Sequence, residues 1–265
     1  MTVIFESGYV LPGSDEPLTH ARIAHSGNWV AGGTSSATST DADFFVDGPE
    51  TSLTYEKWRA GSSSATWTYT FGGSATVDYI CIGAHNFGTI GATITLQALV
   101  SAVWTTVGSG TISSNMPIFS IFEPVSATGV RVTISGGVGE IGVLKAGSAL
   151  QMQQPIYGGH SPLDLSRMTI FRSNLSSTGE FLGRTKLRTA FSTSFSWTEI
   201  TADWVRDNWR PFQLAAEEEP FFIAWRPIDF SEVGLCYVDG MSPPSNQGVR
   251  NFMALNLDVM AYGYD

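Results

Sequence analysis

The chain has 265 residues, of which 43% are hydrophobic and 12% aromatic, and it carries a formal net charge of −10. Its length leaves room for two hydrophobic cores, and its apolar content can fill them without metals or disulfides. Five cations and eleven acids precede residue 149, and nine cations and thirteen acids follow it. Neither half has the excess of cations that a phosphate backbone requires, so we expect no nucleic-acid partner. No run of about 18 apolar residues occurs, so we also expect no membrane span.

The first six residues lack the basic and continuous apolar regions of a signal peptide, which predicts that the chain carries no export signal of its own. Cys81 and Cys236 stand far apart in apolar segments. This predicts two buried free thiols, as in proteins that fold in a reducing cytosol.

Three acids, Asp41, Asp43 and Asp47, follow a Gly/Ser/Thr-rich tract at residues 32–39. Carboxylate oxygens are ligands that Ca²⁺ prefers, but the spacing lacks the glycine and the distal glutamate of an EF-hand. Solvated acids in a turn are therefore the favoured interpretation. We expect no cofactor, with a structural Ca²⁺ at these three residues as the alternative.

From residue 67 onward, short apolar runs alternate with Gly- and Ser-rich breaks. Regularly spaced runs of this kind predict the strands of an antiparallel sandwich. The run at residues 78–83 is apolar on both sides, which is typical of a central strand covered on both faces. Strands are predicted at residues 67–71, 77–82, 92–99, 103–107, 118–122, 130–134 and 141–144.

Gly and Pro breakers after residue 148 predict a boundary between a first domain at residues 1–148, which includes an N-terminal extension, and a second at 149–265. In the second domain, Thr201 can cap a helix over residues 201–209, and Pro211 can begin another short helix that ends before Pro220. Strands are expected at 221–227, 234–238 and 252–260. The predicted fold class is mainly all-β: an antiparallel β-sandwich, then a second β-rich assembly domain with a short helical insert.

The segments 47–58 (DGPETSLTYEKW), 67–71 (WTYTF) and 77–86 (VDYICIGAHN) resemble the discoidin, or galactose-binding-like, family. The resemblance covers roughly residues 17–147 and implies an eight-stranded antiparallel sandwich. Trp58 could stack on a sugar ring, and His85 and Asn86 could line the rim of a ligand site. The alternative is structural: a core tryptophan beside a capped strand end.

The segments 179–184 (GEFLGR) and 220–227 (PFFIAWRP) resemble tail-associated structural proteins of phages and prophages, and more weakly the ring-forming domain of distal tail proteins. Distal tail proteins place the ring domain first, whereas here the sandwich comes first, which leaves the position in the virion open. The resemblance implies a structural subunit of a tailed-phage tail or tail tip, made and assembled in the host cytoplasm as a symmetric homo-oligomer. Its partners would be copies of itself and other tail proteins. The alternative function is a carbohydrate-binding adhesion protein whose partner is a glycan on the host surface.

The second half concentrates large aromatic residues within a short stretch, and this predicts an assembly interface. Aromatic and Arg side chains are enriched at interface hot spots, and Arg pairs bidentately with carboxylates of a neighbouring copy. Along residues 181–191, Arg184, Lys186 and Arg188 alternate and are expected on one side of a strand. The predicted interface residues are Arg184, Arg206, Trp209, Arg210, Trp225 and Arg226.

No nucleophile elbow, phosphate-binding loop or zinc-protease motif occurs, and the four histidines are scattered. A glycoside hydrolase needs two carboxylates about 5 to 10 Å apart in a cleft, whereas the acids here cluster in turns and at segment ends. The sequence therefore predicts that the protein is not an enzyme.

Overall fold

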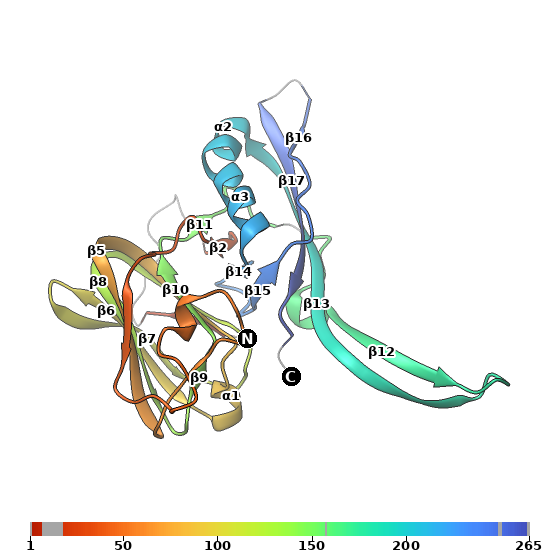
Figure 1. Ribbon diagram of the computed structural model, residues 1–265. Helices are drawn as coiled ribbons and strands as arrows, with labels where there is room; N and C mark the ends of the chain where they lie inside the picture. Colours follow the sequence, from red (N-terminus) through yellow and green to blue (C-terminus); the bar gives the residue numbers. More distant parts are fainter. Residues whose placement is uncertain (1, 7–17, 157, 249–250, 264–265) are drawn as a thin grey trace.

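The computed structural model describes residues 2–6, 18–156, 158–248 and 251–263, and it is built mainly from antiparallel β-sheets (Figure 1). The mainly all-β fold class is confirmed. The first sheet has the strand order β10-β5-β8-β6-β7, with β3 added on β5 and β1 added in parallel on β8. Its strands are β1 (Thr2–Phe5), β3 (Thr34–Ala37), β5 (Ser64–Gly83), β6 (Thr93–Val100), β7 (Val103–Thr111), β8 (Ile118–Ser135) and β10 (Val143–Gly147).

Two strands of the first sheet are longer than the sequence predicts. The runs at 67–71 and 77–82 join into β5, and those at 118–122 and 130–134 join into β8. Gly72 and Gly73 do not end β5, because the two strands keep pairing across a register shift between Thr70 and Ala75. Glycine suits such an irregularity, which bends a strand without ending it.

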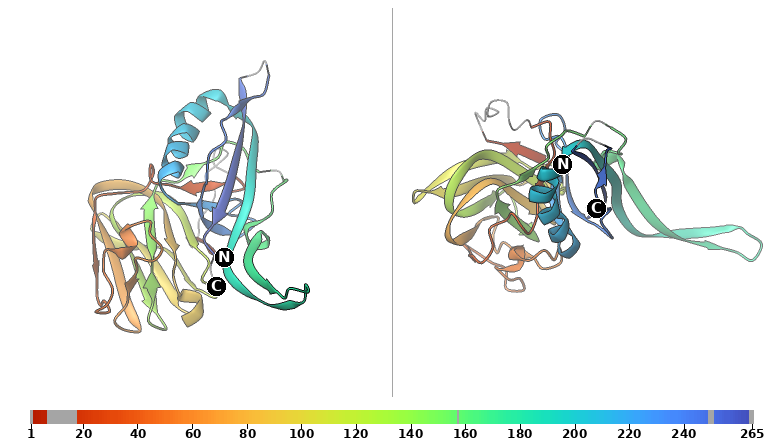
Figure 2. Two further views of the ribbon diagram at one scale, coloured as in Figure 1. Left: turned by 45° about the vertical axis from the view of Figure 1, so that its right-hand side comes forward. Right: turned by 90° about the horizontal axis from the view of Figure 1, so that it is seen from above.

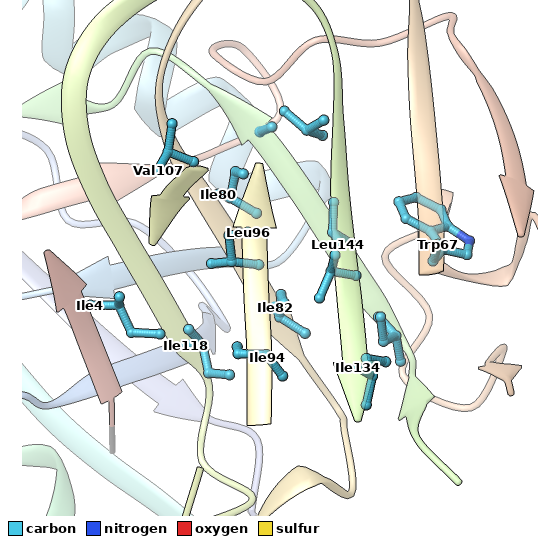
Figure 3. Packing of buried hydrophobic residues seen from close by; sticks show 14 of the residues in the cluster. Ile4, Trp67, Ile80, Ile82, Ile94, Leu96, Val107, Ile118, Ile134 and Leu144 are labelled. Atoms are coloured by element: carbon cyan, nitrogen blue, oxygen red, sulfur yellow. The ribbon is translucent and has the colours of Figure 1, made fainter. Parts of the chain in front are cut away.

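The strands of the first sheet share one core, in which Figure 3 shows Ile4 of β1, Leu96 of β6, Ile118 of β8 and Leu144 of β10 packing with side chains of β5 and β7. Trp67, near the start of β5, shares this core with Ile80 and Ile82 near its end. Every buried residue of this core precedes Gly147. The short pair β4 (Trp58–Arg59) and β9 (Glu140–Ile141) and the helix α1 (Phe87–Ile90) complete this half.

The second sheet has the order β11-β2-β14-β15-β17-β13-β12, with β16 added on β17. Its strands are β2 (Arg22–Ala24), β11 (Leu150–Gln151), β12 (Arg167–Leu175), β13 (Phe181–Thr201), β14 (Phe221–Ala224), β15 (Val233–Tyr237), β16 (Ser245–Asn246) and β17 (Phe252–Ala261). Strand β2 comes from before residue 148 yet pairs with β14 and β11. The division into two domains at residue 148 stays a prediction.

One helical segment packs on the second sheet where the sequence predicts two short helices (Figure 1). It runs through α2 (Ala202–Trp204), the π-helical turn η3 (Val205–Trp209) and α3 (Arg210–Glu218). Pro211 has no N–H and its ring would clash with the carbonyl of residue 207 in a regular α-helix. The wider π-turn directly before Pro211 accommodates it, so the helix continues instead of breaking.

The two sheets pack against each other through a third cluster of buried side chains. Tyr79, Cys81 and Phe119 of the first sheet meet Phe222 and Leu235 of the second. The thiols of Cys81 and Cys236 are buried and free, as predicted. No helix in the described ranges has the length and apolarity needed to cross a bilayer.

Candidate functional site

Trp58, one of the three predicted ligand-binding residues, lies inside the first core. Its side chain is fully buried, and its indole Nε1 donates to Thr40 Oγ1 over 3.0 Å. The ring therefore has no free face on which a sugar could stack. This placement matches the structural alternative.

His85 and Asn86 are also held within the fold. Nε2 of the buried His85 lies 2.8 Å from the carbonyl oxygen of Met116, and Nδ1 accepts from the N–H of Phe87. These partners fix a neutral tautomer protonated at Nε2. Burial lowers the pKa of His85 to about 4. The side-chain amide of Asn86 donates to the carbonyl oxygen of Val138 and accepts from the N–H of Glu140. His85 and Asn86 therefore hold the segment that follows β5 in place.

The three acids proposed for Ca²⁺ do not converge. Asp41 accepts from the backbone N–H of Asp43 over 3.2 Å, and its other oxygen lies 3.8 Å from Nε of Arg59. Asp47 precedes the short 3-10 helix η1 (Gly48–Glu50). In the described part of the chain, no group of three His, Cys, Asp or Glu residues is placed to hold a metal ion.

A cleft does form on the same loop, over residues 43–57. Its volume is about 500 Å³. Phe45 and Tyr55 are its most exposed aromatic residues, each 75% exposed to solvent. We call it the Phe45–Tyr55 cleft; it is lined by Asp43, Phe44, Phe45, Asp47, Gly48, Thr51, Tyr55, Glu56 and Lys57.

Two buried tryptophans hold this loop on the first core. The indole of Trp67 donates to the carbonyl oxygen of Val46 over 2.7 Å, next to Phe45. The indole of Trp58 donates to Oγ1 of Thr40, which lies just before residues 43–57 in the chain. Tryptophan buries a large apolar ring while keeping one donor for such a contact. The two buried indoles of Trp58 and Trp67 therefore fix the position of the loop that carries Phe45 and Tyr55.

The two sides of the loop, around Gly48 and Lys57, also contact each other closely. A Cβ at Gly48 would lie 2.8 Å from the backbone carbon of Lys57, so only glycine fits there. Thr51 Oγ1 donates to the carbonyl oxygen of Gly48 over 3.1 Å, and Nζ of Lys57 lies 3.4 Å from Glu140. These contacts preorganise the cleft, which lowers the entropy that a ligand must overcome on binding.

Exposed rings beside carboxylates can bind a polar ring-shaped ligand. Phe45 and Tyr55 offer apolar faces, and Asp43, Asp47 and Glu56 offer hydrogen-bond acceptors. Small-molecule sites typically combine such an apolar lining with a few polar groups that fix orientation. The sequence identified the segment but not these two aromatic residues, because nothing in it showed that Trp58 points inward and Tyr55 outward.

The predicted interface tryptophans belong to the second core, which corrects the argument that this half has more aromatic area than it can hide. Trp209 is fully buried, and Trp225 is buried with its indole Nε1 donating to Glu232 over 2.7 Å. The core has room for them because Ala21 and Ile23, from before the predicted boundary, and the helical segment help to enclose it.

The four predicted interface arginines are spread over three parts of the second half, with Arg206 and Arg210 together on the helical segment. Arg206 donates to the carbonyl oxygen of Ala202, and Arg226 pairs with Asp229. Arg210 is exposed on the helical segment, whereas Arg184 lies on β13 with its guanidinium 4.2 Å from the Phe171 ring. The structure does not bring them together into one surface.

The sequence matches no family model, and no curated protein matches it. Solved structures of carbohydrate-binding modules are similar to part of the chain. Chitosan-binding module 1 of a chitosanase/glucanase from Paenibacillus sp. IK-5 is 18% identical with a TM-score of 0.41, over 47% of this chain and 98% of that module. The family 32 module of C. perfringens NanJ, solved with galactose, is 19% identical with a TM-score of 0.39, over 48% and 98%. The lectin-binding domain of Lectinolysin, complexed with Lewis b, is 12% identical with a TM-score of 0.39, over 46% and 95%.

Proposed function

We propose that this protein is a non-catalytic carbohydrate-binding protein and that the Phe45–Tyr55 cleft holds the saccharide. The observation that carries the proposal is the pair of aromatic side chains, each 75% exposed, on a loop fixed from beneath by two buried indoles. A monomeric fold gains nothing from holding large apolar rings in water at a preformed cleft.

The chemistry of the cleft favours a neutral or cationic sugar. The C–H face of a pyranose ring packs on an aromatic face, and its hydroxyls donate to carboxylates. Asp43, Asp47 and Glu56 outnumber the single cation Lys57, which itself pairs with Glu140. An acidic glycan would meet like charge in the cleft, so we expect it to bind more weakly than a neutral one.

Screening the full chain against a panel of glycans, followed by calorimetric titration of the best binder, tests this proposal. We expect Phe45→Ala and Tyr55→Ala each to weaken binding about tenfold or more, the loss expected when a hot-spot side chain worth about 1.4 kcal/mol is removed. Leu165→Ala is the matched control, since Leu165 is also an apolar residue that is 75% exposed but lies at the end of the 3-10 helix η2 (Leu163–Leu165), outside residues 43–57. The proposal is wrong if no glycan binds, or if both cleft variants bind as the wild type does.

A second candidate function is a structural subunit of a tailed-phage virion, in the tail or tail tip, with copies of itself and other tail proteins as partners. The observation that favours it is a long hairpin, β12–β13, that extends away from the body of the molecule (Figures 1 and 2). The two functions are compatible, because a tail protein can carry an adhesion module. Immunogold labelling of phage particles with an antibody to this chain should decorate the tail; unlabelled particles would remove this candidate.

A further inference from the structure

The hairpin of β12 and the first part of β13 forms an arm that leaves the molecule without support from a second layer. We define the arm as residues 167–191. Strand β13 begins to pair with β17 at Phe191, and its residues 181–189 pair with β12 alone among the described strands. Nine residues of β12 span about 30 Å in an extended strand. Figures 1 and 2 show the arm pointing away from the helical segment in all three views.

The arm carries more exposed apolar area than an isolated hairpin should. Its exposed apolar residues are Met168, Phe171, Leu175, Phe181, Leu182 and Leu187. A two-stranded hairpin alone in water is at best marginally stable, and clustered apolar side chains on a surface mark sites of interaction. We therefore expect the apolar side chains of the arm to be buried against a binding partner.

The strand register sorts the side chains of the arm onto two faces. Directly opposed residues share a face, so Phe171 lies beside Lys186, and Leu175 beside Phe181. A register shift after Ile170 places Arg188 on the other face, so the three cations of β13 do not share one side as their alternation predicts. The face with Phe171 thus combines apolar side chains with Arg184 and Lys186.

The charge of the arm differs from that of the rest of the chain. Residues 167–191 contain five cations and one acid, whereas the remaining residues contain nine cations and 23 acids. The arm is thus a basic, apolar ribbon on an acidic protein. The surface that complements it is present on every other copy of the same chain.

One acidic surface with an apolar centre lies on the helical segment. Asp203, Asp207, Glu217 and Glu218 are exposed and outnumber the two exposed arginines of this segment, Arg206 and Arg210, and Leu214 is 57% exposed. Oδ1 of Asp203 lies 3.4 Å from Nη1 of Arg206. Leu214, Glu217 and Glu218 lie three and four residues apart in α3 and so share one face, and the exposed Asp203 and Asp207 extend this acidic surface along the helical segment. We call these five residues the acidic stripe.

We propose that the arm of one copy docks, through the face that carries Phe171, Leu175 and Phe181, onto the acidic stripe of a second copy. Leu214 packs against the apolar side chains of the arm, and Arg184 meets the carboxylates around it. Because the arm and the stripe are different surfaces, the contact is head-to-tail and builds a ring or a filament. The proposal does not depend on saccharide binding.

Sedimentation velocity of the full chain tests the proposal. We expect association at low salt that is lost near 1 M NaCl, where the Debye length falls to about 3 Å. Two charge reversals, Arg184→Glu with Lys186→Glu on the arm and Glu217→Lys with Glu218→Lys on the stripe, should each weaken association at least tenfold. Mixing the two variants should restore it, because each reversed surface then meets its opposite charge.

Arg131→Glu and Glu123→Lys on the sandwich are the matched controls and should leave association unchanged. Arg131 lies 4.3 Å from the Trp104 ring and so repeats the arginine–aromatic contact of the arm at another site. Circular dichroism verifies that every variant is folded. A wild type that stays monomeric at low salt, association that survives the arm reversal or the stripe reversal, or a mixture that stays dissociated would each overturn the proposal.

Discussion

Acidification from pH 7 to pH 4.5 is expected to lower the free energy of unfolding by about 2 kcal/mol for each of two buried histidines. Burial lowers the pKa of His25 and of His85 to about 4 each. Below pH 6.5 the unfolded chain binds a proton at each site that the folded chain does not. Stability is therefore fully present above pH 6.5 and is lost as the pH falls toward 4.

Protonation of Glu232 has the opposite effect on the free energy of unfolding over part of this pH range. Burial raises its pKa to about 6, so the folded state binds the extra proton between pH 6 and pH 4.5. This offsets part of the loss at the two histidines. The histidines outweigh it, since there are two of them and each pKa moves further.

Urea denaturation between pH 7 and pH 4.5 measures this effect. We expect His85→Asn to be less stable than the wild type at pH 7, because it loses the bond to Met116, but to lose less stability on acidification. His25→Asn should behave likewise, since the ring of His25 packs 5.3 Å from Phe212 inside the fold. Variants whose stability falls with pH as steeply as that of the wild type would contradict the assignment.

Trp209→Ala is expected to lower the free energy of unfolding by about 3 to 5 kcal/mol, the usual cost of removing a fully buried aromatic side chain. The Trp209 ring centroid lies 5.7 Å from that of Trp197 and 5.0 Å from that of Phe212, and the residue has no exposed surface. Removing it leaves a cavity between the helical segment and the second sheet.

Urea denaturation at pH 7 provides the measurement, with Trp209→Phe as the matched variant that keeps part of the ring and should lose less stability. If Trp209 were instead an assembly residue, as its sequence context suggests, Trp209→Ala would dissociate the assembled protein at unchanged monomer stability. That outcome would contradict the burial described above.

Several parts of the fold could be predicted from the sequence because they depend on local pattern. The apolar runs of the first half correspond to strands, and the helical segment begins directly after Thr201. The prediction that Thr201 caps it is wrong, because the Thr201 hydroxyl bonds to the side chain of Gln153 and makes no capping bond. Strand ends were harder to predict, because Gly72 and Gly73 look the same in a turn and in a bulged strand. Only the partner strand, about fifty residues away in the chain, decides between the two.

Exposure of individual side chains could not be predicted, because it depends on tertiary packing. Trp58, Tyr55 and Phe45 stand in one polar, turn-rich segment, yet the first is fully buried and the other two are mostly exposed. Likewise, the aromatic residues of the second half suggested an interface because β2, which helps to enclose them, lies far away at residues 22–24. The sequence of the arm showed only alternating cations. It did not predict the register shift after Ile170, which places Arg188 on the other face from Arg184 and Lys186.

The most direct test of carbohydrate binding is a map of the bound saccharide on the protein. Amide chemical shifts of the full chain, recorded during titration with the best-binding glycan, would locate the contact. We predict that the largest changes fall within residues 43–57, and that Phe45→Ala together with Tyr55→Ala abolishes them. Changes centred elsewhere, or an identical pattern in the double variant, would contradict the assignment of the Phe45–Tyr55 cleft.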